Sequence, residues 1–278
     1  MLQRLRRLFG KNTPRINVIR LEGAIASGRG LGAMLNAKAL EPILKKAFKK
    51  GTDAVALDIN CPGGSPVQSA LIASRIRQLA DEHKIPVIAF CEDVAASGGY
   101  WLACAADEIY ADENSIIGSI GVIAGGFGAP KALAKLGLER RVYTAGTSKS
   151  TNDPFKPENP KDVAKLKLML GEIHESFKNM VRQRRGTKLK AGEQDLFDGS
   201  FWTGRKALSL GLVDGLGHRN AVLRQRFGEN VQVDEVAAAK GLRAKLLGFS
   251  SRHGLATDFA EASLTALEDR ALWQRFGL

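Results

Sequence analysis

Two glycine-rich turns carry the residues that are best placed to do chemistry. One is INCPGGSP (59–66) and the other is CEDVAASGGYW (91–101), and each joins a predicted strand to a predicted helix. Ligands bind at the carboxyl edge of a parallel sheet, where both turns fall. Backbone N–H groups at a helix start carry partial positive charge, and glycine permits close approach. Ser97 as a nucleophile, with the PGG turn and the Gly98 amide as oxyanion donors, would suit attack on a carbonyl group.

Each turn alone is a weak signal. A PGG sequence occurs in many loops, and a serine before two glycines usually caps a helix. The occurrence of both turns in one chain favours the catalytic interpretation over a simple turn. Tyr100 and Trp101, which follow the glycines, are expected to pack inside the protein rather than to take part in chemistry.

A nucleophilic serine needs a base. No histidine lies in a glycine-rich or apolar motif, so each is expected to be exposed; the four are His83, His174, His218 and His253. A lysine is the alternative, and it can act as a base only where desolvation favours its neutral form. Lys149 is the candidate, because it follows a predicted strand and sits among small and hydroxyl side chains in AGTSKSTNDPF (145–155).

The elements that position these residues alternate between strand and helix. Short apolar runs predict buried strands at 16–21, 53–59 and 85–90, with a helix over 37–50 between the first two. Ser65 is the predicted N-cap of a second helix, in which Pro66 comes first and Gln68 closes a capping box. The predicted buried stripe of this helix contains Val67, Leu71, Ile72, Ile76 and Leu79. The alternation predicts a parallel α/β sheet.

The later part of the chain is less regular. A β-rich run covers 116–123, and 142–146 is predicted to end another strand. A long helix is expected over 160–185, with a buried face of Val163, Leu166, Leu170, Ile173, Phe177 and Val181. Residues 206–217 read as a short helix, a glycine turn and a strand start, and the chain after about 219 is expected to be mostly helical.

Composition limits the classes of function. The 278 residues carry a formal charge of +12, but basic residues lie beside acids and aromatics are sparse, which argues against nucleic-acid binding. The three cysteines lack metal-ligand spacing and are expected to be reduced and buried, so no metal is predicted. No apolar run approaches the ~18 residues of a membrane span. Residues 1–11 are either a basic amphipathic contact with a membrane surface or a frayed tail.

Three stretches together resemble a known family. DINCPGGSPVQSA, EDVAASGGYWLACAADEIYADENSIIGSIGVI and GTSKSTNDPFKPE are similar to the signal peptide peptidase A (protease IV) family of serine peptidases, which has the ClpP–crotonase fold. The resemblance covers about residues 14–225. It implies a ClpP/crotonase-like parallel sheet flanked by helices as the catalytic domain (14–225). A basic N-terminal segment (1–13) would precede it, and a helical C-terminal extension (226–278) would follow.

The resemblance also implies roles for individual residues. It implies a Ser/Lys dyad with Ser97 as nucleophile and Lys149 as general base, and the amides of Gly64 and Gly98 as oxyanion donors. Ser119 matches a serine of the family motif GSIGV, and either orients the lysine or only packs in a turn. The family forms homo-oligomeric rings, so the sequence leaves open whether Lys149 reaches Ser97 of its own chain. Asn60 and Cys61 depart from the family pattern before the PGG turn.

The predicted function is a serine endopeptidase without cofactor or metal. Its expected substrates are apolar peptides with small side chains at the cut site, such as residual signal peptides or unfolded polypeptides. A cytoplasmic location is expected, with residues 1–11 as a peripheral membrane contact. Two alternatives stay open: a crotonase-like acyl-CoA hydratase or isomerase, which would use glutamate bases, and a catalytically silent oligomeric scaffold.

Overall fold

A single mixed sheet forms the centre of the protein. The computed structural model describes residues 13–27, 34–237 and 270–278, and the N-terminal segment 1–12 lies outside the described residues. The strands run in the order β6-β5-β3-β2-β1-β8, with β4 beside β3 and β7 beside β4. Every pair is parallel except β5–β6. The predicted α/β architecture is confirmed, with an antiparallel strand at one edge.

The elements alternate as the sequence predicts over the first hundred residues. The strands are β1 (Arg15–Glu22), β2 (Ala54–Cys61), β3 (Val87–Ala96), β4 (Glu108–Ala111), β5 (Ile116–Gly118), β6 (Phe201–Thr203), β7 (Gly215–Leu216) and β8 (Gln232–Glu235). The main helices are α2 (Ala37–Ala47), α3 (Pro66–His83), α4 (Gly98–Ala103), α5 (Pro130–Lys135), α6 (Pro160–Arg185), α7 (Glu193–Leu196), α8 (Gly204–Leu210) and α9 (Arg219–Phe227), and η1 (Gly186–Lys188) is a 3-10 turn.

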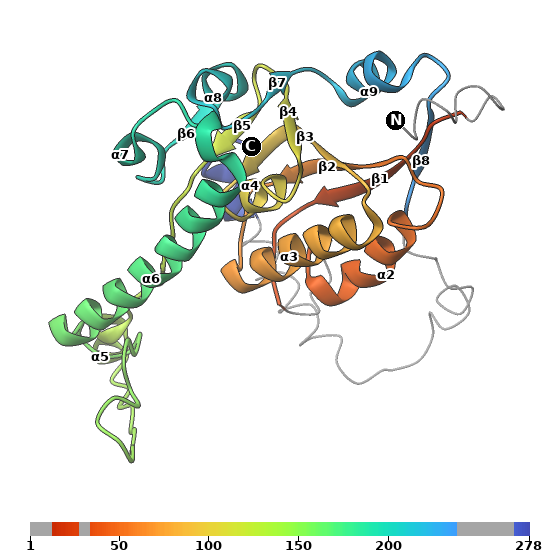
Figure 1. The fold of residues 1–278 in the computed structure, drawn as a ribbon. Coiled ribbons are helices and arrows are strands. Elements are labelled where there is room, and N and C mark those ends of the chain that lie inside the picture. The colour runs from red at the N-terminus through yellow and green to blue at the C-terminus, as the bar shows by residue number, and fades with distance from the viewer. Residues whose placement is uncertain (1–12, 28–33, 238–269) are drawn as a thin grey trace, which may run out of the picture.

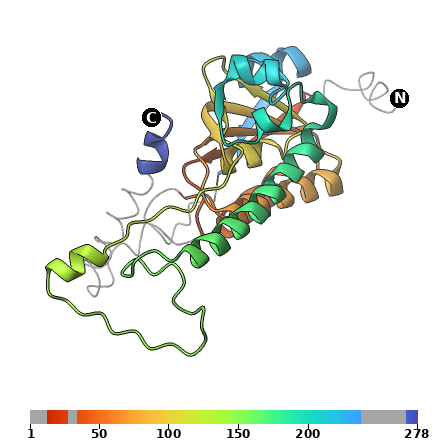
Figure 2. The same cartoon turned by 90° about the vertical axis from the view of Figure 1, so that its left-hand side faces the viewer.

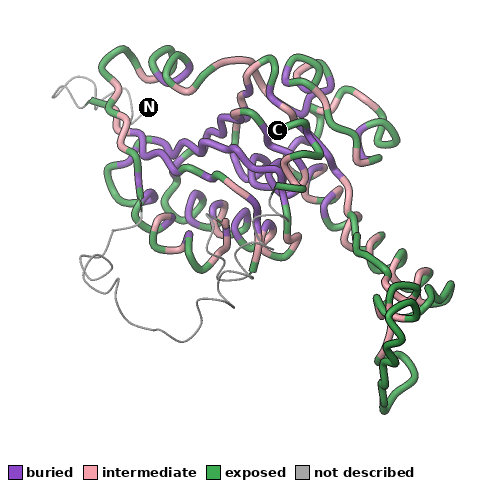
Figure 3. The backbone as a smooth tube through the Cα atoms, turned by 180° about the vertical axis from the view of Figure 1, so that it is seen from behind, coloured by how far each residue is buried: buried purple, intermediate pink, exposed green. Residues whose placement is uncertain are grey.

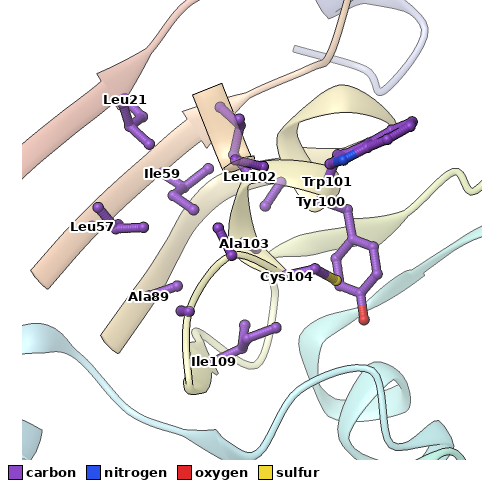
Figure 4. Close-up of a cluster of buried hydrophobic side chains, with 14 of the residues drawn as sticks. Leu21, Leu57, Ile59, Ala89, Tyr100, Trp101, Leu102, Ala103, Cys104 and Ile109 are labelled. Atoms are coloured by element: carbon purple, nitrogen blue, oxygen red, sulfur yellow. The ribbon is translucent and has the colours of Figure 1, made fainter. Parts of the chain in front are cut away.

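Helices cover the sheet on both faces (Figure 1). On one face, α2, α3 and α4 pack on the apolar side chains of β1, β2 and β3 in the largest buried cluster. Figure 4 shows part of this cluster, in which Leu102 and Ala103 of α4 lie beside Ile59, while the rings of Tyr100 and Trp101 point away from the strands. On the other face, Val222 and Leu223 of α9 cover Ile16 and Ile88. Helix α4 is therefore held by packing on the strands beneath it.

Helix α3 begins as predicted but presents a different face to the core. The Ser65 hydroxyl accepts from the Gln68 amide, which confirms the N-cap. The Gln68 side chain does not complete a capping box, because it accepts instead from the amide of Ala37. The prediction of burial is wrong for Val67 and Leu71, which are exposed, whereas Ile72, Ile76 and Leu79 are buried. The buried face of α3 is the one in contact with α2 and α4, which pack beside it.

Three predictions for the later chain are corrected. Residues 142–146 form no strand, and the β-rich run 116–123 is a strand only at Ile116–Gly118. Strand β8 lies in the extension that was expected to be helical, and it pairs with β1 in parallel. Pairing with a buried strand edge outweighs the weak local pattern of Gln232–Glu235. Residues 270–274 are helical, and residues 238–269 lie outside the described part.

A long arm projects from the body of the protein (Figures 1 and 2). It consists of residues 122–159, which include α5, together with the first half of α6. Most of the predicted buried face of α6 is only partly buried, and Phe177 and Val181 alone of that face are fully covered. The arm is almost entirely exposed in Figure 3. No helix in the described residues is long and apolar enough to cross a membrane.

Candidate active site

The two glycine turns lie side by side because of an irregularity in the sheet. Ile59 pairs with Cys91, but Cys61 pairs with Ala95, so β3 contains two extra residues between these pairs. The Asn60 side chain holds this bulge: it accepts from the Val94 amide (3.2 Å) and donates to Asp93 (2.8 Å). The shifted register continues into the turns. It places Gly63 and Gly64 beside Ser97 and Gly98.

Ser97 occupies a strained corner between β3 and α4. Its φ of 52° and ψ of −120° lie in a region that L-residues rarely adopt. The amide of Ser97 donates to the Gly118 carbonyl (2.8 Å), and its carbonyl accepts from Trp101 (3.0 Å). The Ser97 hydroxyl makes no capping hydrogen bond to α4. A serine that served only as an N-cap would make that bond, so the side chain is available for another purpose.

Two amides next to Ser97 have no backbone partner. Within the described residues, neither the Gly64 nor the Gly98 N–H donates to another backbone group. Gly64 pairs with Ile25 through the Gly63 carbonyl and the Ser65 amide, which turns its own N–H to the opposite side, towards β3. A Cβ on Gly63 would lie 2.8 Å from the Ser97 Cβ and 2.9 Å from the Gly98 nitrogen. Only glycine permits this approach.

Ser97 and Gly98 open onto a cavity of about 250 Å³. Its wall is mostly apolar and comes from five parts of the chain. The lining residues are Pro62, Gly64, Pro66, Ser69, Ser97, Gly98, Trp101, Gly121, Val122, Ile123, Phe177, Leu272 and Arg275. Such a space suits an apolar side chain or peptide segment held next to the hydroxyl.

A larger hollow of about 530 Å³ lies elsewhere on the protein and contains none of the predicted site residues. It is lined by charged side chains that include Arg20, Asp58 and Arg219. Asp58 pairs with Arg219, and its Oδ1 atom is buried without a hydrogen-bond partner. We assign the site to the smaller cavity because the available hydroxyl and the two amides converge there.

The predicted base lies outside this cavity. Lys149 is exposed in a turn of the arm, with its amide bonded to the Gly146 carbonyl, and it is absent from the cavity wall. Ser119 is nearer to the site: it is buried, has a φ of 52° and follows Gly118, which binds the Ser97 amide. Within one chain, the fold brings together Ser97, Gly64 and Gly98, but it does not bring Lys149 to them.

The histidines provide no alternative base in the described structure. None of them lines the cavity. His83 and His218 are exposed, as expected, and His253 lies outside the described residues. His174 is partly buried rather than exposed, because its Nε2 atom makes a hydrogen bond with the Ile120 carbonyl (3.0 Å). It contacts the loop that follows Ser119 rather than the Ser97 hydroxyl.

Three contributors to the site were not found from the sequence. Leu272 and Arg275 line the cavity from the far end of the chain, and no local pattern marks them. Asn60 stood out only as a departure from the family pattern, although it holds the bulge that aligns the turns. The cysteines behave as expected: Cys61, Cys91 and Cys104 are buried and unbridged, and burial raises the pKa of the Cys104 thiol to about 11. Among the described residues, no cluster of metal-ligating side chains is present.

A family model agrees with this geometry. The model of peptidase family S49 matches residues 80–234, which include β3, Ser97 and the arm. The chain belongs to peptidase family S49. This membership confirms the resemblance found in the sequence, and it supports a serine-type peptidase. Relatives named SppA and protease 4 also match the chain.

Similarity extends over most of the chain in several relatives. A protein of Synechocystis that is named a protease is 31% identical over 87% of this chain and 87% of its own length. A protein of Brucella abortus named Na(+)/H(+) antiporter NhaA is 48% identical over 95% of this chain. The chain spans only 37% of that Brucella protein, so the similarity concerns one part of it.

A solved structure confirms the fold class. A mutant of the membrane-bound stomatin-specific protease 1510-N superposes with a TM-score of 0.52, over 82% of this chain and 99% of the other. The two sequences are 17% identical, so this likeness concerns the fold alone. It agrees with the expected ClpP-like arrangement of a sheet flanked by helices.

Proposed function

We propose that this chain is a serine endopeptidase that works through a Ser97/Lys149 dyad. The observation that carries the proposal is the uncapped Ser97 hydroxyl, held at a strained corner beside two unpartnered amides and open to an apolar cavity. A turn with only a structural role would not require this combination of features. Membership of peptidase family S49 supports the same class of reaction.

The proposed reaction has two steps. A neutral Lys149 amine takes the proton from Ser97 as the hydroxyl oxygen attacks the peptide carbonyl, and the amides of Gly64 and Gly98 stabilise the oxyanion. The protonated lysine then gives its proton to the leaving amine. The same lysine then takes a proton from the water that attacks the acyl carbonyl, and it returns that proton to the Ser97 oxygen as the acyl group leaves. Each step is acid–base transfer through one side chain, so the mechanism uses no metal or cofactor.

We further propose that Lys149 acts on Ser97 of a neighbouring copy. Lys149 is exposed on an arm that projects from the body, whereas Ser97 lies at the sheet. A homo-oligomeric ring would bring the arm of one subunit over the cavity of the next. Contact with a second copy would also remove water from the amine, which is the condition for a neutral lysine. Ser119, buried near the turn, is proposed to orient that amine.

The apolar cavity supports apolar peptides as substrates, including residual signal peptides and unfolded polypeptides. Ser97, Gly64 and Gly98 stand on the wall of this space, so the peptide bond to be cut would lie across it. We place the activity in the cytoplasm, with residues 1–11 as a contact with the membrane surface. These terminal residues lie outside the described part of the structure.

Replacing Ser97 tests the nucleophile. Cleavage of a fluorogenic apolar peptide by Ser97→Ala should fall by at least ~10³-fold, because the acyl intermediate cannot form. Ser209→Ala is the matched control, since Ser209 lies on the surface of α8, where its hydroxyl donates to the Lys206 carbonyl. Undiminished cleavage by purified Ser97→Ala would show that another group attacks the peptide.

Replacing Lys149 tests the base. Lys149→Ala should cut kcat by ~10²–10⁴-fold and should slow labelling of Ser97 by an acylating serine probe. Lys206→Ala is the control, because Lys206 is also exposed but lies on α8. Wild-type labelling rates in Lys149→Ala would exclude the lysine while leaving Ser97 as the nucleophile.

A further inference from the structure

The end of the chain is docked against the strand that leads to Ser97. Trp273 and Phe276, in the last described segment (270–278), pack on Val94 and Ala96 of β3. The Phe276 ring also meets Phe201 of β6 edge to face, with centroids 5.2 Å apart. These contacts anchor the segment beside the site, although it is remote from the glycine turns in sequence.

This docking completes the wall of the cavity. Leu272 and Arg275 are the two lining residues that come from the segment. Leu272 adds an apolar side chain to a wall that already contains Trp101 and Phe177. Of the thirteen described residues that line the cavity, Arg275 is the single charged one. A cation next to the nucleophile in an otherwise uncharged site favours an anionic group on the bound peptide.

Arg275 is free to bind such a group. No carboxylate in the described residues pairs with it, and its guanidinium lies 5.8 Å from the centroid of the Phe276 ring. Most of the other arginines in the described residues have an acidic partner: Arg185 binds Asp214, for example. A guanidinium without an acidic partner keeps its fork of N–H donors for a carboxylate, which it can bind in a bidentate manner.

We propose that Arg275 recognises a carboxylate of the peptide bound at Ser97, while Leu272 contacts the apolar part beside it. The inference rests on the proposed function and narrows the substrate class to apolar peptides that carry a carboxylate near the bond to be cut. The carboxylate belongs either to an acidic side chain or to the free C-terminus of the peptide. Both present the same group to Arg275.

Peptide binding to the full-length Ser97→Ala protein tests the inference without cleavage. Three fluorescent versions of one apolar peptide are compared by anisotropy: a free C-terminus, an amidated C-terminus, and an amidated C-terminus with one internal glutamate. At least one acidic version should bind ~3–10-fold more tightly than the neutral amide, as expected for a partly exposed ion pair. The acidic version that gains affinity identifies the source of the carboxylate.

A second substitution in the Ser97→Ala protein tests whether Arg275 causes the preference for the acidic peptide. Adding Arg275→Ala should abolish it, Arg275→Glu should reverse it, and Arg275→Lys should retain part of it. Arg270→Ala is the matched control, because Arg270 belongs to the same segment and does not line the cavity. Equal binding of all three peptides, or a preference that survives Arg275→Ala, would overturn the inference.

Salt and cleavage give two further readouts. The preference should shrink as ionic strength rises from 0.05 to about 0.5 M, since screening weakens an exposed pair. In the wild type, the ratio of kcat/KM for acidic over neutral peptide should exceed one and should fall in Arg275→Ala. If the wild-type protein cleaves none of the peptides but still binds the acidic one more tightly through Arg275, the proposed function is wrong and this inference stands.

Discussion

Ser97 holds a backbone conformation that its residue type disfavours. A non-glycine residue at a φ of 52° and ψ of −120° costs ~1–3 kcal/mol, which the hydrogen bonds of its amide and carbonyl offset. Strain of this kind persists where the surroundings hold it in place. Here the strain directs a side chain away from α4 and towards the cavity, as a nucleophile requires.

The strained backbone at position 97 predicts that a glycine variant is more stable than an alanine variant. Ser97→Gly should be more stable than Ser97→Ala by about 1 kcal/mol, because glycine adopts positive φ freely. In an ordinary helix the alanine variant is the more stable. That order is expected for Ser176→Ala and Ser176→Gly, because Ser176 is exposed in the interior of α6. Urea unfolding of the four variants measures both differences. A Ser97→Ala variant more stable than Ser97→Gly would mean that the corner is unstrained.

Asp58 predicts a dependence of stability on pH. Burial raises the pKa of this carboxyl to about 6, although Arg219 pairs with it. The folded state therefore holds the proton more strongly than the unfolded state, whose aspartate has a pKa near 3.9. The stabilisation is present in full below pH ~4 and is lost as pH rises through ~6.

Asp58→Asn removes this titration. Relative to the variant, the wild type should lose roughly 1–2 kcal/mol between pH 4.5 and 7.5, allowing for solvent screening of a partly exposed pair. Chemical unfolding of both proteins at the two pH values measures the change. A constant difference between them would show that Asp58 keeps an ordinary pKa.

At the scale of elements, the β3 bulge aligns the site. Two extra residues in β3 move Ala95 opposite Cys61, and this shift continues into both turns. Asn60 supports the bulge from the neighbouring strand by bonding to Val94 and Asp93. Bulges beside active sites commonly redirect the chain in this manner. The proposed oxyanion donors, Gly64 and Gly98, thus depend on a side chain that does not line the cavity.

Asn60→Ala should lower kcat by about tenfold with little change in KM, because oxyanion donors act mainly in the transition state. Asn60→Asp keeps the acceptor for the Val94 amide but places a second carboxylate beside Asp93, so its activity relative to the wild type at the same pH should rise as the pH is lowered. Steady-state kinetics at several pH values tests both variants. A fall in melting temperature without a fall in kcat would assign Asn60 a structural role alone.

At the scale of the whole molecule, the arm exposes large apolar side chains to solvent. A protein that works as a monomer would normally bury such side chains. The arm's most exposed large apolar residues are Ile123, Phe127, Leu136, Leu138, Tyr143 and Leu168. Phe127 and Tyr143 are 96% and 91% exposed. Contiguous exposed apolar residues are typical of association surfaces. A second copy that covers the arm would also receive Lys149.

Charge on this surface should break the association. Leu136→Asp should reduce the mass measured by light scattering and should lower cleavage in parallel, because both effects follow from the lost contact. Val67→Asp is the control, since Val67 is 65% exposed on α3 in the body. An unchanged mass in Leu136→Asp would place the contact between subunits elsewhere.

Mixing of inactive variants tests whether the dyad forms between copies. If Lys149 serves a neighbour, subunits of Ser97→Ala and Lys149→Ala that are mixed and reassembled in equal amounts should regain about a quarter of wild-type activity, since a quarter of the contacts join two intact residues. A dyad within one chain would give no recovery. The rate of peptide cleavage before and after reassembly measures the outcome.

Local chemistry explains why the early predictions are confirmed. The Ser65 cap, the buried strands and the strand–turn–helix at Ser97 depend on residues a few positions apart. The errors concern partners distant in sequence. Leu71 has helical spacing but no element covers it, and Gln232–Glu235 form a strand because β1 offers an edge.

The sequence by itself determined the α/β class and the family, and it singled out the residues proposed to do the chemistry, because glycine turns, helix caps and apolar periodicity act locally. Only the tertiary structure decided how those residues meet. The register between β2 and β3 placed the proposed oxyanion donors beside Ser97, and docking of residues 270–278 placed Arg275 on the wall of the same cavity. Projection of the arm separated Lys149 from the serine of its own chain. Each of these depends on contacts between segments far apart, whose energies no local pattern records.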